Sequence, residues 1–370
     1  MLAICTLLLT SLQDPATLTV ADGAVSQPQV AIAATDQGPE VYVAFVRDGR
    51  QVALRTLRPG GQFAAEVPIA GAITTAGMRR GPRVAAVTGS VCVSAIVFDR
   101  EHGRDGELMA WRSSDSGSTF EGPFAVSDVP GAAREGLHDM AAASDGTLGC
   151  AWLDLRSGRT EVHASFSRDG GRSWTPSARV YRSPDGSVCE CCAPCVAFDR
   201  KDRFLVLFRN ALAGRRDMWL AIGGTDGFAK AEKLGKESWN IAVCPMAPGA
   251  LAPDAGDPLT LWRREERIFR CAPGGKEEEV GRGGELAAVA GAGGMWAAWI
   301  GSGADSSLLL LRPGAPAPEQ VAAAAHWPVL ASAPGDSGPL ALAWEDHSSG
   351  RVALRLQFFA AATDAQKKTD

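Results

Sequence analysis

The sequence is poor in several residues and patterns on which common protein classes depend. It has only two tyrosines and five histidines among 370 residues, and its net charge of −5 is spread along the chain without a basic stretch. Nucleic-acid-binding proteins usually carry a basic face or tail, so this distribution does not favour a nucleic acid as partner. The sequence also lacks a phosphate-binding loop, a dinucleotide fingerprint and a Ser-His-Asp arrangement.

Long hydrophobic runs are missing apart from one at the N-terminus. Residues 2–12 form an apolar run of about signal-peptide length, which is too short to span a bilayer as a helix. The run has no basic beginning and no Ala-x-Ala cleavage site, so a buried N-terminal strand is the alternative. We expect residues 1–13 to be a signal peptide, the protein to be exported to the periplasm or the extracellular space, and residues 360–370 to be a disordered tail.

Glycine and proline are abundant, with 42 and 22 residues, which indicates many short strands joined by turns. Two segments 54 positions apart share the pattern S-x-D-x-G-x-[ST]-aromatic. The aspartate can cap backbone amides, the glycine permits a positive φ, and we expect the aromatic residue to pack into the core of its own sheet. The segments contain Ser113, Asp115, Gly117 and Phe120, and Ser167, Asp169, Gly171 and Trp174.

A longer repeat covers most of the chain. Short apolar runs end in an aromatic residue and are followed at once by polar residues, at intervals of 53, 54, 56, 54, 37 and 45 positions. A strand of small residues precedes each run and a third strand follows, which is the pattern of a propeller blade. We therefore predict an all-β fold, a single β-propeller over residues 14–359. We prefer seven blades, with residues 16–20 closing the last, and six is the alternative because the fifth and sixth units are short. The repeated aromatics are Phe45, Phe98, Trp152, Phe208, Trp262, Trp299 and Trp344.

The S-x-D-x-G segments resemble the Asp box, or BNR repeat, of the sialidase-like β-propellers. A C-x-C-C loop at residues 189–194 and a W-x-I/A-x-C-P segment at residues 239–245, with His138, are similar to bacterial proteins called sialidase-like. The resemblance implies a propeller in which the Asp box is a structural turn. For a true sialidase it also implies three arginines that bind a carboxylate, a Tyr–Glu nucleophile pair and an Asp acid/base. The arginine and tyrosine pattern is not recognisable here, since Tyr42 lies inside a strand and only Tyr181 is a candidate.

The repeat places many polar residues at one rim. In a four-stranded meander, the loop into the first strand and the loop after the second strand lie at the same end of the sheet. We expect a glycan or small ligand to bind at this channel mouth. The loops after the second strands contribute Asp99, Arg100, Asp154, Arg156, Arg209, Asn210, Glu345 and Asp346.

Four of the nine cysteines lie within seven residues at this rim, and two more residues join them there. The spacing and residue types fit a soft-metal site for zinc or copper, and they fit equally a disulfide clamp between neighbouring blades. The sequence leaves both possibilities open, with reduced buried thiols as a third. The residues concerned are His138, Cys189, Cys191, Cys192, Cys195 and Cys244.

We expect a binding protein more than an enzyme. The competing hypothesis is a glycoside hydrolase that uses paired carboxylates, Asp139 with Asp154 or Glu345 with Asp346, together with Arg156, Arg209 and Tyr181. A third possibility is an interaction scaffold with no small ligand.

Overall fold

The computed structural model describes residues 15–70, 80–98, 105–253, 257–333 and 338–359. Every regular element in these ranges is a β-strand. The predicted signal peptide, the predicted tail, and the site candidates Asp99 and Arg100 lie outside the described residues. No helix long and apolar enough to cross a membrane occurs in the part of the chain that the structure describes.

The first three groups of strands, each called a sheet here, are antiparallel meanders that follow one another along the chain, and one residue pair, Ala133 with Gly106, joins the second to the third. The first contains β2 (Val25–Thr35), β3 (Gly38–Arg47), β4 (Gln51–Arg58) and, at its outer edge, β5 (Gln62–Phe63) and β6 (Val67–Ala70). The second contains β7 (Arg83–Val87), β8 (Ser90–Phe98), β9 (Gly106–Ser113) and β10 (Glu121–Ala125). The third contains β11 (Ala133–Ala142), β12 (Leu148–Asp154), β13 (Glu161–Ser167) and β14 (Ala178–Tyr181).

Four further groups continue the pattern. The next contains β15 (Cys195–Phe198), β16 (Phe204–Arg209), β17 (Met218–Gly224), β18 (Gly227–Phe228) and β19 (Glu232–Lys233). It is followed by β20 (Ala250–Ala252), β21 (Leu259–Arg264), β22 (Arg267–Cys271) and the first part of β23 (Glu278–Gly291). The rest of β23 pairs in order with β24 (Gly294–Gly301), β25 (Leu308–Leu311) and β26 (Glu319–Ala322). The last group contains β27 (Ala325–Ser332), β28 (Leu340–Asp346), β29 (Ala353–Phe359) and β1 (Thr17–Asp22) from the other end of the chain.

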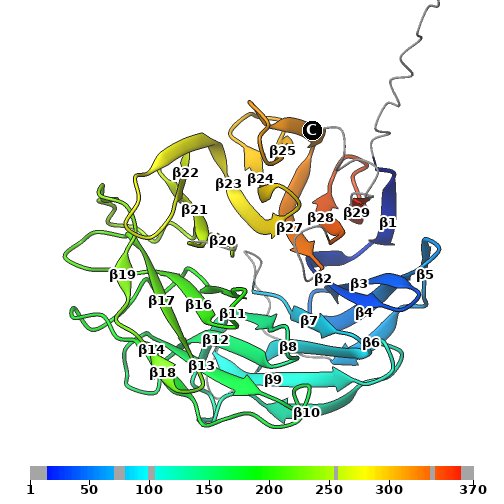
Figure 1. Cartoon of the computed structure of the whole chain (residues 1–370), viewed down its shortest axis with the longest axis horizontal. Helices are drawn as coiled ribbons and strands as arrows, with labels where there is room; N and C mark the ends of the chain where they lie inside the picture. Colours follow the sequence, from blue (N-terminus) through cyan, green and yellow to red (C-terminus); the bar gives the residue numbers. More distant parts are fainter. Residues whose placement is uncertain (1–14, 71–79, 99–104, 254–256, 334–337, 360–370) are drawn as a thin grey trace, which may run out of the picture.

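The sheets stand around a central axis, as Figure 1 shows. The first strand of each group contacts the first strand of the next, in the order β2, β7, β11, β15, β20, β23, β27 and back to β2. This closed ring of inner strands defines a β-propeller, as predicted. The grouping supports seven blades, and that number remains our prediction.

Strand β23 explains why the fifth and sixth repeats are so close together in sequence. Its first half pairs with β22 and its second half with β24, so one strand passes from the outside of one sheet to the inside of the next. Gly283 lies at the crossing with φ of 140°. A Cβ atom at this position would lie 1.9 Å from the carbonyl oxygen of Ile300, so only glycine fits there.

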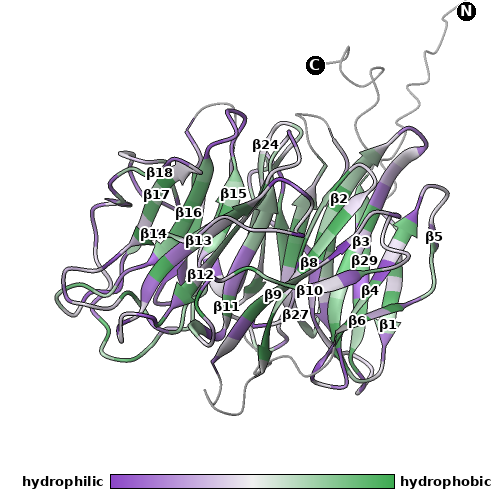
Figure 2. Ribbon diagram, turned by 90° about the horizontal axis from the view of Figure 1, so that it is seen from below, coloured by the Kyte–Doolittle hydropathy of each residue, from purple (hydrophilic) through white to green (hydrophobic). Residues whose placement is uncertain are grey.

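The hydrophobic cores lie between neighbouring sheets rather than within one. Phe120 packs with residues of the first and second sheets, and Trp174 with residues of the second and third. Our expectation that these aromatics pack into their own sheet was therefore wrong, because each sheet is a single layer and can bury a side chain only against a neighbour. The aromatics at the ends of the second strands follow the same rule; Trp152, for example, lies in the core shared with the preceding sheet. Apolar residues run along strands such as β2 and β16 between the two rims (Figure 2).

The two S-x-D-x-G segments form the same hydrogen-bonded turn between the third and fourth strands of their sheets. In the first turn, Asp115 accepts hydrogen bonds from the Thr119 amide and hydroxyl at 2.9 and 2.6 Å. In the second turn, Asp169 accepts the equivalent bonds from Ser173 at 2.9 and 2.6 Å. These turns lie at the rim opposite to the loops that lead into the first strands, so they are far along the strands from the cysteine loop.

Candidate functional site

The cysteine loop connects the third sheet to β15, the innermost strand of the fourth. The Cys189 amide donates to the Arg209 carbonyl (2.9 Å), which holds the start of the loop beside the end of β16. The chain then turns at Glu190 and Cys191, so that Cys189 and Cys192 face each other across the turn. The loop therefore curls, which is what adjacent cysteines need in order to converge on one place.

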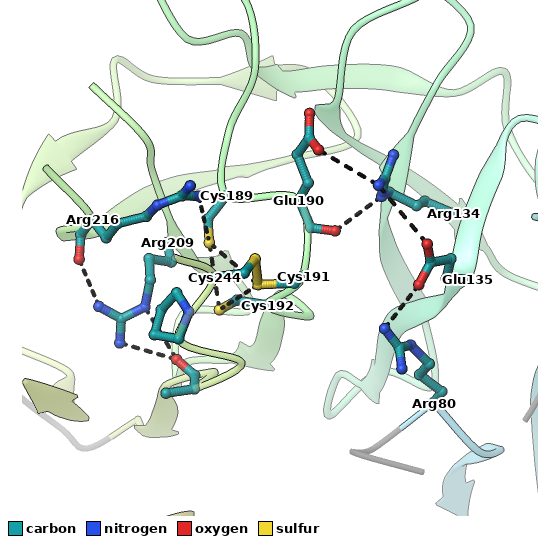
Figure 3. Close-up of a disulfide and its surroundings, with 12 residues drawn as sticks. Arg80, Arg134, Glu135, Cys189, Glu190, Cys191, Cys192, Arg209, Arg216 and Cys244 are labelled. Atoms are coloured by element: carbon teal, nitrogen blue, oxygen red, sulfur yellow. Dashed lines mark hydrogen bonds and ion pairs between the residues drawn. A yellow bond between two sulfur atoms is a disulfide. The ribbon is translucent and has the colours of Figure 1, made fainter. Parts of the chain in front are cut away.

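Three sulfur atoms meet in this turn, and a fourth arrives from the next sheet (Figure 3). The Cys189 Sγ lies 3.8 Å from the Cys191 Sγ and 3.6 Å from the Cys192 Sγ. Cys191 is bonded to Cys244, which lies in the loop leading into β20, with a Cα–Cα distance of 6.3 Å. This disulfide links the rim loops of the fourth and fifth sheets, so a disulfide clamp is present.

Whether each sulfur is a thiol or part of a disulfide also decides how well the cluster fits a metal. Among the described residues, the cluster of candidate metal ligands contains Cys189, Cys191 and Cys192, with all ligand atoms within 4.8 Å of one another. Because the Cys191 sulfur is bonded to Cys244, it has no thiolate to offer, and two thiols remain. Zinc sites use three or four protein ligands, so the cluster with its disulfide does not fit that metal.

The two thiols of the turn differ in their electrostatic surroundings. The Arg216 Nη1 donates to the Cys189 Sγ at 3.3 Å. Hydrogen bonding with Cys192 and the positive charges of Arg216 and Arg209 lower the pKa of the Cys189 thiol to about 6. Burial instead raises the pKa of the Cys192 thiol well above its usual value. Near neutral pH, Cys189 is thus the thiolate and Cys192 the thiol of the pair.

A chain of charged residues holds the tip of the turn from the side of the third sheet. The Arg134 Nε donates to the Glu190 carbonyl (2.9 Å), and its guanidinium lies 3.6 Å from the Glu190 carboxylate and 3.8 Å from that of Glu135. Glu135 pairs in turn with Arg80 at 2.8 Å. These contacts tie the cysteine loop to the second and third sheets, so the loop is anchored on both sides.

His138 does not belong to the sulfur cluster, contrary to our expectation. Its Nδ1 lies 3.2 Å from the Gly136 carbonyl oxygen and its Nε2 3.1 Å from the Ser94 Oγ, so both ring nitrogens have partners in the protein. Burial and the positive charge of Arg83 lower the pKa of His138 to about 3. The histidine is a neutral core residue that links β11 to β8.

Cys195 also lies outside the cluster, within β15 on the wall of the central channel. The cavity between the inner strands has a volume of about 310 Å³ and is lined mainly by small apolar residues. The charged residues of this lining are Arg83 and Asp139, which form an ion pair at 3.1 Å. Asp139 further accepts a hydrogen bond from the Val196 amide (2.8 Å), so this candidate catalytic carboxylate joins three neighbouring inner strands.

Asp154, the proposed partner of Asp139, is fully buried and has its own set of donors. It accepts hydrogen bonds from the Trp152 Nε1 (2.8 Å) and from the Arg156 amide (2.9 Å), Nε (2.8 Å) and Nη2 (2.9 Å). Arg156 also pairs with Asp128 at 3.1 Å. Asp154 and Arg156 thus shape the loop after β12, and their polar groups already have partners within the protein.

Glu345 belongs to a recurring structural device that the sequence did not reveal. Gln27, Glu135, Glu285 and Trp327 each have a positive φ, between 45° and 55°, near the start of an inner strand where the register of pairing shifts. A carboxylate from the preceding sheet accepts the amide hydrogen of three of these bulge residues: Glu345 from Gln27 (2.7 Å), Glu285 from Trp327 (2.6 Å) and Asp105 from Glu135 (3.1 Å). These carboxylates fasten one sheet to the next.

The remaining candidates have structural partners as well. Arg209 is buried and donates to the carbonyl oxygens of Ala247, Arg216 and Arg263, while its guanidinium lies 5.1 Å from the Trp239 ring centroid. Asp346 pairs with Arg355 at 2.8 Å.

Tyr181 accepts a hydrogen bond from the Asn210 Nδ2 (3.1 Å), and its ring packs against Phe208 and Trp219. Burial raises the pKa of Tyr181. The Tyr181 hydroxyl thus bonds to an amide, whereas an activated tyrosine nucleophile needs a carboxylate.

Comparisons with known proteins support the architecture. No protein-family model matches the sequence, and a search of curated proteins finds no match. Among solved structures, the chain is similar to an ulvan lyase, a polysaccharide lyase (TM-score 0.56, 11% identity, 96% of this chain and 99% of that chain). It is also similar to an α-L-arabinofuranosidase from Fusarium graminearum (TM-score 0.52, 12% identity, 94% and 98%) and an α-L-arabinanase from Penicillium chrysogenum (TM-score 0.50, 11% identity, 93% and 98%). At such identities the likeness establishes the β-propeller fold.

Proposed function

We propose that this protein is an exported β-propeller that binds a carbohydrate at the rim around the Cys191–Cys244 disulfide. The observation that carries the proposal is the disulfide itself, which fixes the relative position of two rim loops from neighbouring sheets. A cross-link that rigidifies a surface in its bound shape improves affinity by lowering the entropy lost on binding. Disulfides persist in oxidising compartments, which supports export.

The surface beside the disulfide has the mixed character of a ligand site. Val243 and Met246 flank Cys244 and expose 67% and 44% of their surface, although large apolar side chains are mostly buried elsewhere in the described chain. Glu190 precedes Cys191 on the other side of the cross-link and is half exposed, within an ion pair with Arg134. Apolar contacts next to a few charged groups suit a sugar, which presents apolar C–H faces and hydroxyl groups together.

The solved propellers to which the chain is similar support a carbohydrate as the ligand. The ulvan lyase and the α-L-arabinanase are both named for a polysaccharide. The Asp-box turns further favour a relationship to the sialidase-like group. Binding is preferred over hydrolysis because Asp139, Asp154 and Glu345 serve as hydrogen-bond acceptors inside the protein.

A glycan array followed by titration calorimetry on the best-bound sugar tests the proposal. We expect Val243→Ser and Met246→Ser to weaken binding, and Thr225→Ala, an exposed position in the turn of the opposite rim, to leave it unchanged. Binding that is equally weakened by Thr225→Ala, or no binding to any glycan, would refute the proposed site.

A further inference from the structure

The cysteine loop holds an oxidised and a reduced pair of cysteines side by side. Cys191 and Cys244 form a disulfide, whereas Cys189 and Cys192 are thiols. The three sulfurs of the turn form a triangle, in which the Cys189 Sγ lies 3.8 Å from the Cys191 Sγ and 3.6 Å from the Cys192 Sγ, and the Cys191 and Cys192 sulfurs are 4.0 Å apart. A disulfide is exchanged when a thiolate attacks one of its sulfurs and a second thiol then resolves the new bond. The Cys189 Sγ is therefore close enough to attack the disulfide at Cys191, and the Cys192 Sγ is close enough to resolve the new bond.

We propose that this cluster is a thiol–disulfide exchange site, which passes electrons from the buried Cys189 and Cys192 pair to a disulfide outside the protein. In the first step the Cys189 thiolate attacks the Cys191 Sγ, a Cys189–Cys191 bond forms, and Cys244 leaves as a thiolate. In the second step Cys192 attacks the Cys189 Sγ, and the leaving Cys191 sulfur, 4.0 Å from that of Cys192, takes up the Cys192 proton. The disulfide now joins Cys189 to Cys192, and Cys191 and Cys244 are reduced.

The last step involves the external substrate, a disulfide written R–S–S–R′. One thiolate of the Cys191 and Cys244 pair attacks it and releases RS⁻, and the other sulfur resolves the mixed disulfide and releases R′S⁻. The Cys191–Cys244 bond is restored. Overall, two electrons move from Cys189 and Cys192 to the external disulfide, and one proton lost by Cys192 is matched by one proton taken up by a released thiolate.

The burial of the four cysteines fits the different roles of the two pairs. Cys189 and Cys192 are inaccessible to solvent, with exposures of 0% and 1%. Cys191 and Cys244 are both partly exposed. An external disulfide can therefore reach the second pair, and it can reach the first pair only by way of Cys191.

The polar contacts of Cys189 fit the role of the attacking group. A core cysteine needs no guanidinium, yet the Arg216 Nη1 lies 3.3 Å from the Cys189 sulfur, and Arg209 lies nearby with its guanidinium held by backbone carbonyls. Positive charge stabilises a thiolate and makes it available near neutral pH. Cys92 shows the contrast, since burial raises the pKa of that core thiol to about 12.

Disulfide mapping after equilibration with glutathione and glutathione disulfide, with acid quenching and alkylation, tests the proposal on the full-length protein. We expect wild type to form a Cys189–Cys192 linkage under oxidising ratios. Cys192→Ala should instead accumulate a Cys189–Cys191 linkage, because the resolving thiol is missing. If wild type keeps Cys189 and Cys192 reduced at every ratio, the proposal is wrong.

Two matched variants test whether Cys189 and Cys192 are oxidised by way of Cys191 or directly by the external disulfide. Circular dichroism shows whether each variant is folded. Cys191→Ala and Cys244→Ala both lack the clamp, but only Cys244→Ala keeps the sulfur that faces Cys189. Formation of the Cys189–Cys192 linkage should be slower in Cys191→Ala by roughly tenfold or more, since an intramolecular attack has a far higher effective concentration than a bimolecular one. Equal rates in the two variants would overturn the proposed path. These readouts do not involve sugar binding, so they stand apart from the proposed carbohydrate site.

Discussion

The clamp between the fourth and fifth sheets should contribute measurably to the stability of the propeller. Cys191 and Cys244 are 53 positions apart. In the chain-entropy treatment, closing a loop of that length lowers the entropy of the unfolded chain enough to stabilise the folded protein by about 4 kcal/mol. The double variant Cys191→Ser/Cys244→Ser should lose about this much free energy of unfolding.

The double variant should nevertheless fold, because other contacts cross the same junction. Arg209, on β16, donates hydrogen bonds to the Ala247 and Arg263 carbonyls of the next sheet. Strands β15 and β20 are also in contact at the axis. The disulfide therefore adds to a junction that is already formed.

Urea denaturation followed by tryptophan fluorescence measures the effect. Reduction of the wild type should lower its stability to that of the double variant, and the same reductant should not alter the double variant. A loss below about 1 kcal/mol on removal of the disulfide would refute the reasoning, because it would mean that the cross-link hardly restricts the unfolded chain.

Three further predictions concern single side chains. The Arg216 charge lowers the pKa of the Cys189 thiol, so Arg216→Gln added to the Cys192→Ala protein should move the half-maximal rate of Cys189–Cys191 formation to higher pH than in Cys192→Ala alone, while exposed Arg215→Gln should not shift it. Asp154→Ala should destabilise the protein by roughly 3 kcal/mol, because it leaves Trp152 and Arg156 donors unpaired; a fully stable variant in urea denaturation would contradict its structural role. His138 should not titrate between pH 5 and 8 in NMR spectra, since its pKa is lowered to about 3. The unfolded chain then binds a proton that the folded protein does not, so wild type should lose stability as pH falls below about 6.5, and His138→Gln should lose less.

The limits of sequence reasoning appear most clearly in the carboxylates. The repeat pattern placed Asp139, Asp154 and Glu345 in rim loops, which made them reasonable ligand or catalytic candidates, whereas the structure places all three within strands. Hydrogen bonds to Val196, Trp152 and Gln27 use these groups instead. The contacts of Asp139 and Glu345 join residues far apart in the chain, so no local pattern could have predicted them. The positive φ values at the bulges would have been a signal only if glycine or asparagine had occupied those positions.

The sequence by itself determined that this chain is an all-β propeller, because alternating apolar strands, recurring aromatics and tight turns are local features that repeat along it. It also determined that cysteines gather at one rim. Only the tertiary structure decided which sulfurs are bonded, since the Cys191–Cys244 pair depends on two loops from neighbouring sheets coming within 6.3 Å. The same folding placed Arg216 beside Cys189 and His138 beside Ser94. Those contacts form only when neighbouring sheets pack together in the ring. They give Cys189 a charged partner and make His138 a structural residue.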